Sequence, residues 1–172
     1  MTHNGYRFFL TIVDDNSRMT WVYLLKFKSD VFHILQSFLS LVQTLFKKQV
    51  KRVWSDNETE FFNKECTELF SKQGIVHESS CPYTPQQNGV AERKHWHVLE
   101  VSRALRFHGH IPLRFWGECV FAVVYLIFRL PTTILKGKIP YEVFHKVKAK
   151  IDHLKTLGCL CYVTRVPKAD KF

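Results

Sequence analysis

Apolar residues recur along the chain with two different periods, and these periods predict the secondary structure. Four short runs rich in β-branched and aromatic residues predict strands, and they cover residues 6–13, 20–26, 50–55 and 75–79. Longer stretches with apolar residues at spacings of three and four predict helices, and they cover residues 31–46, 63–73, 90–107, 112–130 and 140–147. A further β-rich run covers residues 157–166.

The order of these elements predicts the fold class. Turn-forming residues 14–18 separate the first two strands and predict a hairpin. Strands and helices then alternate before two consecutive helices. This order predicts an α/β protein with a mixed sheet flanked by helices.

Composition narrows the functional class. At 172 residues with 46% hydrophobic residues, the chain is long and apolar enough for one packed domain with a partial second one. The 25 Lys and Arg residues against 15 Asp and Glu residues give a net charge of +10. Such a charge favours a polyanionic partner such as nucleic acid, although an ordinary basic protein has the same composition.

Cysteine and histidine spacings give no metal motif. The five cysteines include no CxxC pair, so free or buried thiols in a reducing compartment are expected. The pairs His95/His97 and His108/His110 have no Cys or His partner at zinc-binding spacing. No signal peptide is expected at the amino terminus. The apolar segment 115–130 falls short of the ~20 residues that span a bilayer, so it is expected to be a buried helix.

Two carboxylates are the main candidates for chemistry. Asp56 closes the third predicted strand, and Glu92 lies 36 positions later at the start of the long helix. A carboxylate at a strand end and another on a neighbouring helix are typical of two-metal sites for phosphoryl transfer. Taken singly, Asp56 could be a solvent-facing turn residue, and Glu92 could stabilise the helix end through the helix dipole.

The residues around these carboxylates resemble the integrase core of copia-type LTR retrotransposons. The similar blocks are YRFFLTIVDD (6–15), WSDN (54–57), TPQQNGVAER (84–93), RLP (129–131) and GCLCY (158–162). The resemblance covers essentially the whole chain. It implies a ribonuclease-H-like fold and a DDE triad holding two Mg²⁺ or Mn²⁺ ions, with Asp56 and Glu92 as catalytic and metal-binding residues. The family cleaves near the 3′ ends of element DNA and joins them to target DNA.

The same resemblance implies that DNA is bound around Glu92. The residues expected to contact DNA are Tyr83, Gln87, Asn88, Arg93 and Lys94. Tyr83 could equally pack under its loop, and Arg93 and Lys94 could form a solvated helix face.

Several positions depart from the family pattern. No Asp-x-x-Gly-Pro block precedes residues 6–13, so the fold is expected to lack its first strand and the triad its first aspartate. Whether Asp14 or Asp15 replaces that aspartate stays open. Glu58 stands where the family has Gly, where a side chain would strain a left-handed backbone and repel Asp56. Trp96 replaces a basic residue, and Phe128 replaces Asn. These departures predict very low or absent activity and a poorly soluble open sheet edge.

The expected organisation is an incomplete integrase core over residues 1–135, followed at 136–172 by a connector and the start of a small β domain. The expected partners are DNA ends, target DNA and further copies of the chain, with no membrane and no small-molecule substrate. The family implies a nuclear or virus-like-particle location. The alternatives are a non-enzymatic nucleic-acid-binding or oligomerising module and an active ribonuclease-H-type nuclease.

Overall fold

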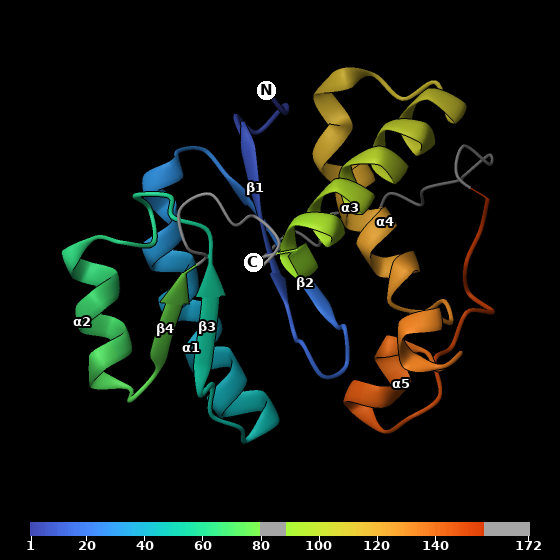
Figure 1. The fold of residues 1–172 in the computed structure, drawn as a ribbon. Coiled ribbons are helices and arrows are strands. Elements are labelled where there is room, and N and C mark those ends of the chain that lie inside the picture. The colour runs from blue at the N-terminus through green and yellow to red at the C-terminus, as the bar shows by residue number, and fades with distance from the viewer. Residues whose placement is uncertain (80–88, 157–172) are drawn as a thin grey trace, which may run out of the picture.

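Two strand pairs lie among five α-helices in the computed structural model, which describes residues 1–79 and 89–156 (Figure 1). Strands β1 (Phe8–Val13) and β2 (Thr20–Leu25) form the predicted antiparallel hairpin, with Phe8 opposite Leu25 and Val13 opposite Thr20. Strands β3 (Arg52–Ser55) and β4 (Val76–Ser79) run parallel, joined through a helix.

The two pairs are separate ladders in the described part of the chain, whereas the sequence predicted one mixed sheet. The antiparallel and parallel components are both present, but no pairing within residues 1–79 and 89–156 connects them. The hydrophobic period identifies a strand and its buried face. It does not identify which strands pair, because pairing joins residues far apart in sequence.

Helix α1 (Val31–Phe46) follows a short 3₁₀ turn, η1 (Lys28–Asp30), and has the predicted bounds. The Asp30 carboxylate accepts hydrogen bonds from the backbone N–H groups of Lys26 and Phe27, at 3.1 and 2.9 Å. It therefore fixes the turn that leads into the helix, instead of capping the helix by a side-chain bond. The apolar stripe of α1 is buried at Val31, Leu35, Phe38, Leu39 and Val42.

Helix α2 (Lys64–Lys72) has both of its ends fixed by local chemistry. The Asn63 side chain accepts a 2.8 Å hydrogen bond from the Cys66 N–H, which is a standard N-cap contact. Gly74 has φ +66°, a conformation that glycine adopts without steric cost, and it ends the helix directly after the predicted range 63–73.

The second half of the described chain is helical. Helix α3 (Gly89–His108) is followed by the 3₁₀ turn η3 (Leu113–Phe115) and helix α4 (Trp116–Ile127). A further 3₁₀ turn, η4 (Thr133–Leu135), precedes the short helix α5 (Pro140–His145). The helices lie where they were predicted, but η3 replaces the first turn expected after Pro112. Helix α4 ends at Ile127 instead of residue 130, and α5 ends at His145 instead of residue 147.

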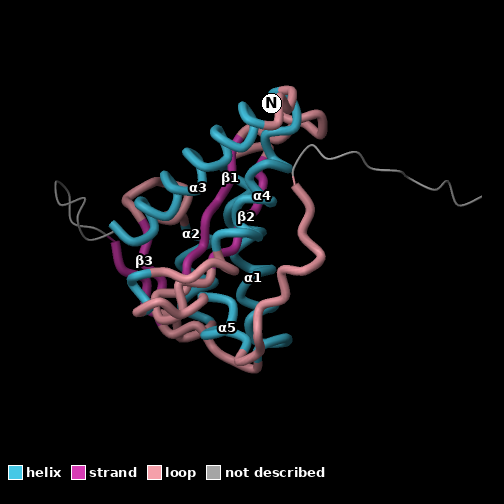
Figure 2. The backbone as a smooth tube through the Cα atoms, turned by 90° about the vertical axis from the view of Figure 1, so that its right-hand side faces the viewer, coloured by secondary structure: helices cyan, strands magenta, loops and turns pink. Residues whose placement is uncertain are grey.

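The β1–β2 hairpin lies between two hydrophobic cores, and Figure 2 shows its strands running through the middle of the molecule. Side chains of β1 alternate between the cores. Leu10 and Ile12 pack against the core built by α1 and α2, and Phe9 packs against the core built by α3 and α4. This alternation is the period of two expected for a strand covered on both faces.

Other predictions can be compared only where the chain is described. Cys66 and Cys119 are buried free thiols, as expected, and burial raises the pKa of both. No helix in residues 1–79 or 89–156 is long and apolar enough to cross a membrane. The predicted loop at 80–88 and the β-rich run at 157–166 lie outside the described residues.

Candidate active site

Asp56 directly follows β3, and its backbone is fixed by a buried serine. The Ser55 hydroxyl donates a 2.9 Å hydrogen bond to the Asp56 carbonyl oxygen and lies 2.9 Å from Nε2 of His77 on β4. Because the single hydroxyl proton goes to the carbonyl, His77 Nε2 is the protonated donor to Ser55. Burial lowers the pKa of His77, which favours this neutral ring.

The Asp56 carboxylate lies in a site that is rich in negative charge. Burial raises the pKa of Asp56, and the charges of Glu58, Glu60 and Glu92 raise it further. The Glu58 backbone N–H opposes them by donating a hydrogen bond to the carboxylate. The buried Oδ1 atom of Asp56 has no hydrogen-bond partner among the described residues. A bound cation would satisfy this oxygen and offset the repulsion.

Glu92 reaches this region because helix α3 is fixed against β1. His95 Nδ1 lies 3.0 Å from the Thr11 hydroxyl, and the His95 ring stacks on Phe9 with centroids 4.2 Å apart. Burial lowers the pKa of His95, and the nearby Asp56 carboxylate partly offsets this effect. Glu92 and His95 both interact electrostatically with Asp56, so the first turns of α3 lie beside the end of β3.

Glu58 adds charge near Asp56 without the backbone strain considered from the sequence. Its φ is not among the positive values, so a side chain at this position imposes no left-handed conformation. Lys28 Nζ lies 2.5 Å from Glu58 and 2.9 Å from Glu60, and these bonds raise the pKa of Lys28. The predicted repulsion of Asp56 by Glu58 is present, and Lys28 is its counter-ion.

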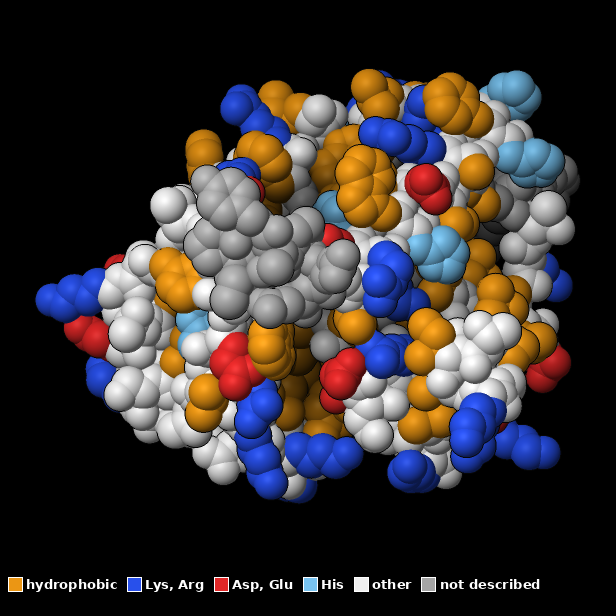
Figure 3. Space-filling model, in the orientation of Figure 1, with side chains coloured by type: hydrophobic (Ala, Val, Ile, Leu, Met, Phe, Trp, Pro, Cys, Tyr) orange, Lys and Arg blue, Asp and Glu red, His pale blue; other side chains and the backbone are white. Residues whose placement is uncertain are grey.

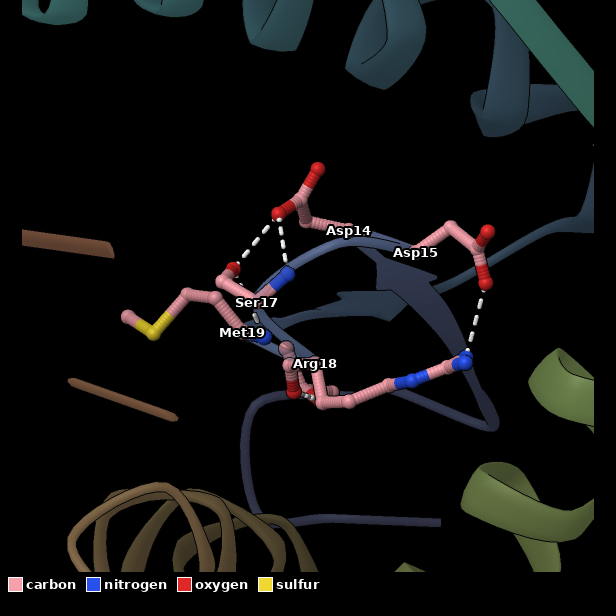
Figure 4. A network of polar contacts seen from close by, with 6 residues as sticks. Asp14, Asp15, Ser17, Arg18 and Met19 are labelled. Atoms are coloured by element: carbon pink, nitrogen blue, oxygen red, sulfur yellow. Dashed lines mark hydrogen bonds and ion pairs between the residues drawn. The ribbon is translucent and has the colours of Figure 1, made fainter. Parts of the chain in front are cut away.

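Asp14 and Asp15 are both engaged by residues of the hairpin turn (Figure 4). Asp14 Oδ2 accepts hydrogen bonds from the backbone N–H and hydroxyl of Ser17. Asp15 Oδ1 pairs with Arg18 Nη1 at 2.8 Å, and Arg18 has φ +59°. Neither aspartate is among the charges that act on Asp56. In residues 1–79 and 89–156, no group of three His, Cys, Asp or Glu side chains is arranged to hold a metal ion.

The expected DNA contacts are only partly within the described chain. Tyr83, Gln87 and Asn88 lie outside it. Arg93 is exposed, and its guanidinium covers Gly89, whose added Cβ would lie 2.9 Å from Arg93 Nη1. Lys94 is half-buried, and burial followed by the charge of Arg18 lowers its pKa. Arg93 therefore lies on the outer face of α3, whereas Lys94 faces inward.

Sequence reasoning did not identify the contacts that support Asp56. The Ser55–His77 contact and the Lys28 pairs join residues 22 to 32 positions apart. For His77, one signal was present, because it lies in the strand that follows the Asp56 strand. For Lys28, the sequence carried no signal, since an exposed lysine after a strand is common.

Comparison with known proteins decides the family. Residues 1–85 match the integrase core domain family. The chain is 40% identical over 167 residues to the retrovirus-related Pol polyprotein from transposon TNT 1-94 of Nicotiana tabacum. This match covers 97% of the chain and 12% of that protein. The chain belongs to the integrase core family of retrotransposon Pol polyproteins.

A second relative agrees with this assignment. The Pol polyprotein from transposon RE1 of Arabidopsis thaliana is 38% identical over 162 residues, covering 94% of the chain and 11% of that protein. The integrase core chain thus spans about an eighth of the curated relatives that it matches.

Solved structures confirm the ribonuclease-H-like fold. The chain superposes with a TM-score of 0.67 on a chain of the simian T-cell lymphotropic virus intasome in complex with PP2A regulatory subunit B56 gamma. That match is 16% identical and covers 96% of this chain and 56% of the other. The HTLV-2 integrase catalytic core domain in complex with magnesium gives 0.58 at 17% identity, covering 77% and 81%.

Proposed function

We propose that Asp56 and Glu92 of this integrase core are the second and third carboxylates of a DDE metal site that acts on DNA ends in a copia-type element. We further propose that this chain alone does not catalyse 3′-end processing or strand transfer. The observation that carries the proposal is the Asp56 carboxylate, which has an unpartnered buried oxygen and a pKa raised by burial and by three nearby carboxylates, Glu92 included.

The unpartnered buried oxygen of Asp56, in a site rich in negative charge, supports a proposed divalent metal. Carboxylate oxygens are the ligands that Mg²⁺ and Mn²⁺ prefer, and Asp56 and Glu92 would hold the ion. When bound, such ions activate water or a 3′-hydroxyl and stabilise the charge that develops on phosphorus. Ser55, which His77 contacts, donates a hydrogen bond to the Asp56 carbonyl oxygen and so fixes the backbone that carries the carboxylate.

The proposed lack of activity rests on the number of carboxylates. Asp56 and Glu92 are the two residues proposed as triad ligands, and Asp14 and Asp15 are engaged with Ser17 and Arg18. The charge of Glu58 also favours protonation of Asp56, which competes with metal binding. Both features weaken a two-metal site that needs ionised ligands.

DNA is the proposed partner, and further copies of the chain are expected on the DNA ends. The net charge of +10 and the exposed Arg93 support attraction to phosphates. One structural neighbour is an intasome chain, and another is described as trimeric. The division into a core at 1–135 and a connector with a β segment at 136–172 belongs to this proposal. So does a nuclear or particle location.

A non-enzymatic nucleic-acid-binding or oligomerising module is the second candidate, favoured by the basic charge. An active ribonuclease-H-type nuclease is the third, favoured by the fold alone. The three candidate functions predict different results on labelled DNA and RNA–DNA substrates.

The test is Mn²⁺-dependent strand transfer and disintegration by the chain and by its Asp56→Asn and Glu92→Gln variants. We expect DNA binding that weakens with salt and no turnover above the variants. Turnover that both substitutions abolish would overturn the proposed inactivity. Cleavage of an RNA–DNA hybrid would favour the nuclease. A chain that does not bind DNA even at low salt would have no role on DNA.

A further inference from the structure

Trp96 on helix α3 presents an indole to solvent one turn beyond Glu92. Its relative exposure is 59%, whereas Val98, two positions later on the same helix, is fully buried against α4. The core of α3 is therefore complete without Trp96. A tryptophan left in water gives up a large apolar area that burial would stabilise.

The direction of the Trp96 side chain is fixed by its neighbour. His95 is tied to β1 by the Thr11 hydroxyl at 3.0 Å and by stacking on Phe9. Successive helical side chains point ~100° apart, so a ring clamped at 95 turns residue 96 away from the hairpin. Residues four apart share a face, so Trp96 lies on the same side of α3 as Glu92.

The exposed face of α3 alternates aromatic and basic side chains. Arg103 lies seven residues after Trp96, and Phe107 follows at 66% exposure with the Arg106 guanidinium 4.2 Å above its ring. Glu100 is the acidic residue on this exposed face beyond Glu92. In Figure 3, hydrophobic side chains lie among Lys and Arg side chains over α3.

A single exposed tryptophan is common on protein surfaces, and an apolar patch can also contact another protein. The charge of the chain favours nucleic acid over another protein. The chain carries +10, and Arg93 and Arg103 lie three and seven residues from Trp96 on α3, where they offset Glu92 and Glu100, four residues to either side of it. Aromatic rings interleaved with cations are typical of surfaces that stack single-stranded bases, because the rings take bases and the cations take phosphates.

We propose that Trp96 is a stacking platform for an unpaired nucleobase of DNA lying beside the Asp56–Glu92 site. This inference rests on the proposed action on DNA ends and adds the contact with an unpaired base. A lysine at position 96 would instead offer a phosphate contact. Stacking carries little salt dependence, whereas a phosphate contact carries much.

The test measures binding of a labelled single-stranded oligonucleotide of about 12 nucleotides, within the range of single-strand sites. A second oligonucleotide of the same length has abasic sugars in place of its central nucleotides. The variants are Trp96→Phe, Trp96→Leu and Trp96→Lys. Phe121→Leu is the matched control, because it removes another exposed ring, on α4. Circular dichroism checks that each variant is folded.

We expect Trp96→Leu to weaken binding about 5- to 100-fold and Trp96→Phe to retain most of the affinity. The wild type should bind the abasic oligonucleotide as weakly as Trp96→Leu binds the intact one. Trp96→Leu should bind the two oligonucleotides with equal affinity. Trp96→Lys should steepen the slope of log affinity against log salt by about 0.7. Tryptophan fluorescence should be quenched more strongly by the oligonucleotide in the wild type than in Trp96→Phe, which keeps Trp21, Trp54 and Trp116.

Equal affinity and equal base dependence in the wild type and Trp96→Leu would overturn this inference and leave the action on DNA ends standing. A loss of the same size in Phe121→Leu would also overturn it, since the effect would then not be specific to Trp96. A wild type that binds neither oligonucleotide nor duplex DNA at low salt would overturn both proposals.

Discussion

At the scale of single residues, Asp56 combines a backbone that is held in place with a carboxylate that lies among other negative charges. Ser55 and His77 hold the adjacent backbone, and one carboxylate oxygen has no partner among the described residues. The family resemblance of the blocks around Asp56 and Glu92, and not their residue types alone, led to the prediction of a carboxylate pair. The support from Ser55 and His77 was not predictable, because it depends on the register between β3 and β4, in which Ser55 is opposite Ser79.

Glu58 offers a test of this electrostatic description. Glu58→Gln removes one of the charges that raise the Asp56 pKa, so that pKa should fall toward its ordinary value. Carbon-detected NMR titration of the side-chain carboxyl of Asp56 measures the change. Glu68→Gln, on α2 and paired with Lys64, is the matched control and should leave the Asp56 titration unchanged. An unchanged titration in Glu58→Gln as well would show that the Glu58 charge does not raise this pKa.

At the scale of elements, local signals predicted most of the fold. The apolar stripe of α1 gave that helix its bounds, and Asn63 and Gly74 gave α2 its start and end. The turn formers at 14–18 gave the hairpin. Each of these signals acts within a few residues. The separation of the strands into two ladders was not predictable in this way, since contacts between distant residues set it.

The start of α2 is a point where an element supports the site. Asn63 accepts a hydrogen bond from Cys66 N–H and donates one to the Glu60 carbonyl at 3.0 Å, so it joins the helix to the loop that carries Glu58 and Glu60. Asn63→Ala should lower the free energy of unfolding by about 1 kcal/mol. Urea denaturation measures this loss. Asn63→Asp keeps the oxygen acceptor and should retain most of the stability; an equal loss in both variants would argue against the cap.

At the scale of the whole molecule, two cores share one hairpin, and three half-buried histidines make the stability of the fold sensitive to acid. Burial lowers the pKa of His77, His95 and His145. In the unfolded chain these rings bind protons near pH 6.5, whereas in the folded chain they bind protons only at a lower pH. Their contribution to stability is therefore present above about pH 6.5 and is lost as pH falls toward their folded pKa values.

Urea denaturation between pH 7.5 and 5 should accordingly show that the free energy of unfolding decreases as the pH is lowered below about 6.5. His95→Gln should flatten that dependence, because one of the three rings no longer titrates. The matched control is His97→Gln, two residues along α3 and exposed, which should leave the profile unchanged. A stability that does not change across this range would contradict the burial of the three rings.

The most direct measurement of the central claim is Mn²⁺ binding to the chain by isothermal titration calorimetry at neutral pH. The account predicts that Asp56→Asn and Glu92→Gln each abolish binding, because both carboxylates hold the same ion. Glu100→Gln, two turns along α3 from Glu92, should bind as the wild type does. Wild-type binding that survives both the Asp56 and the Glu92 substitutions would contradict the claim that these residues form one metal site.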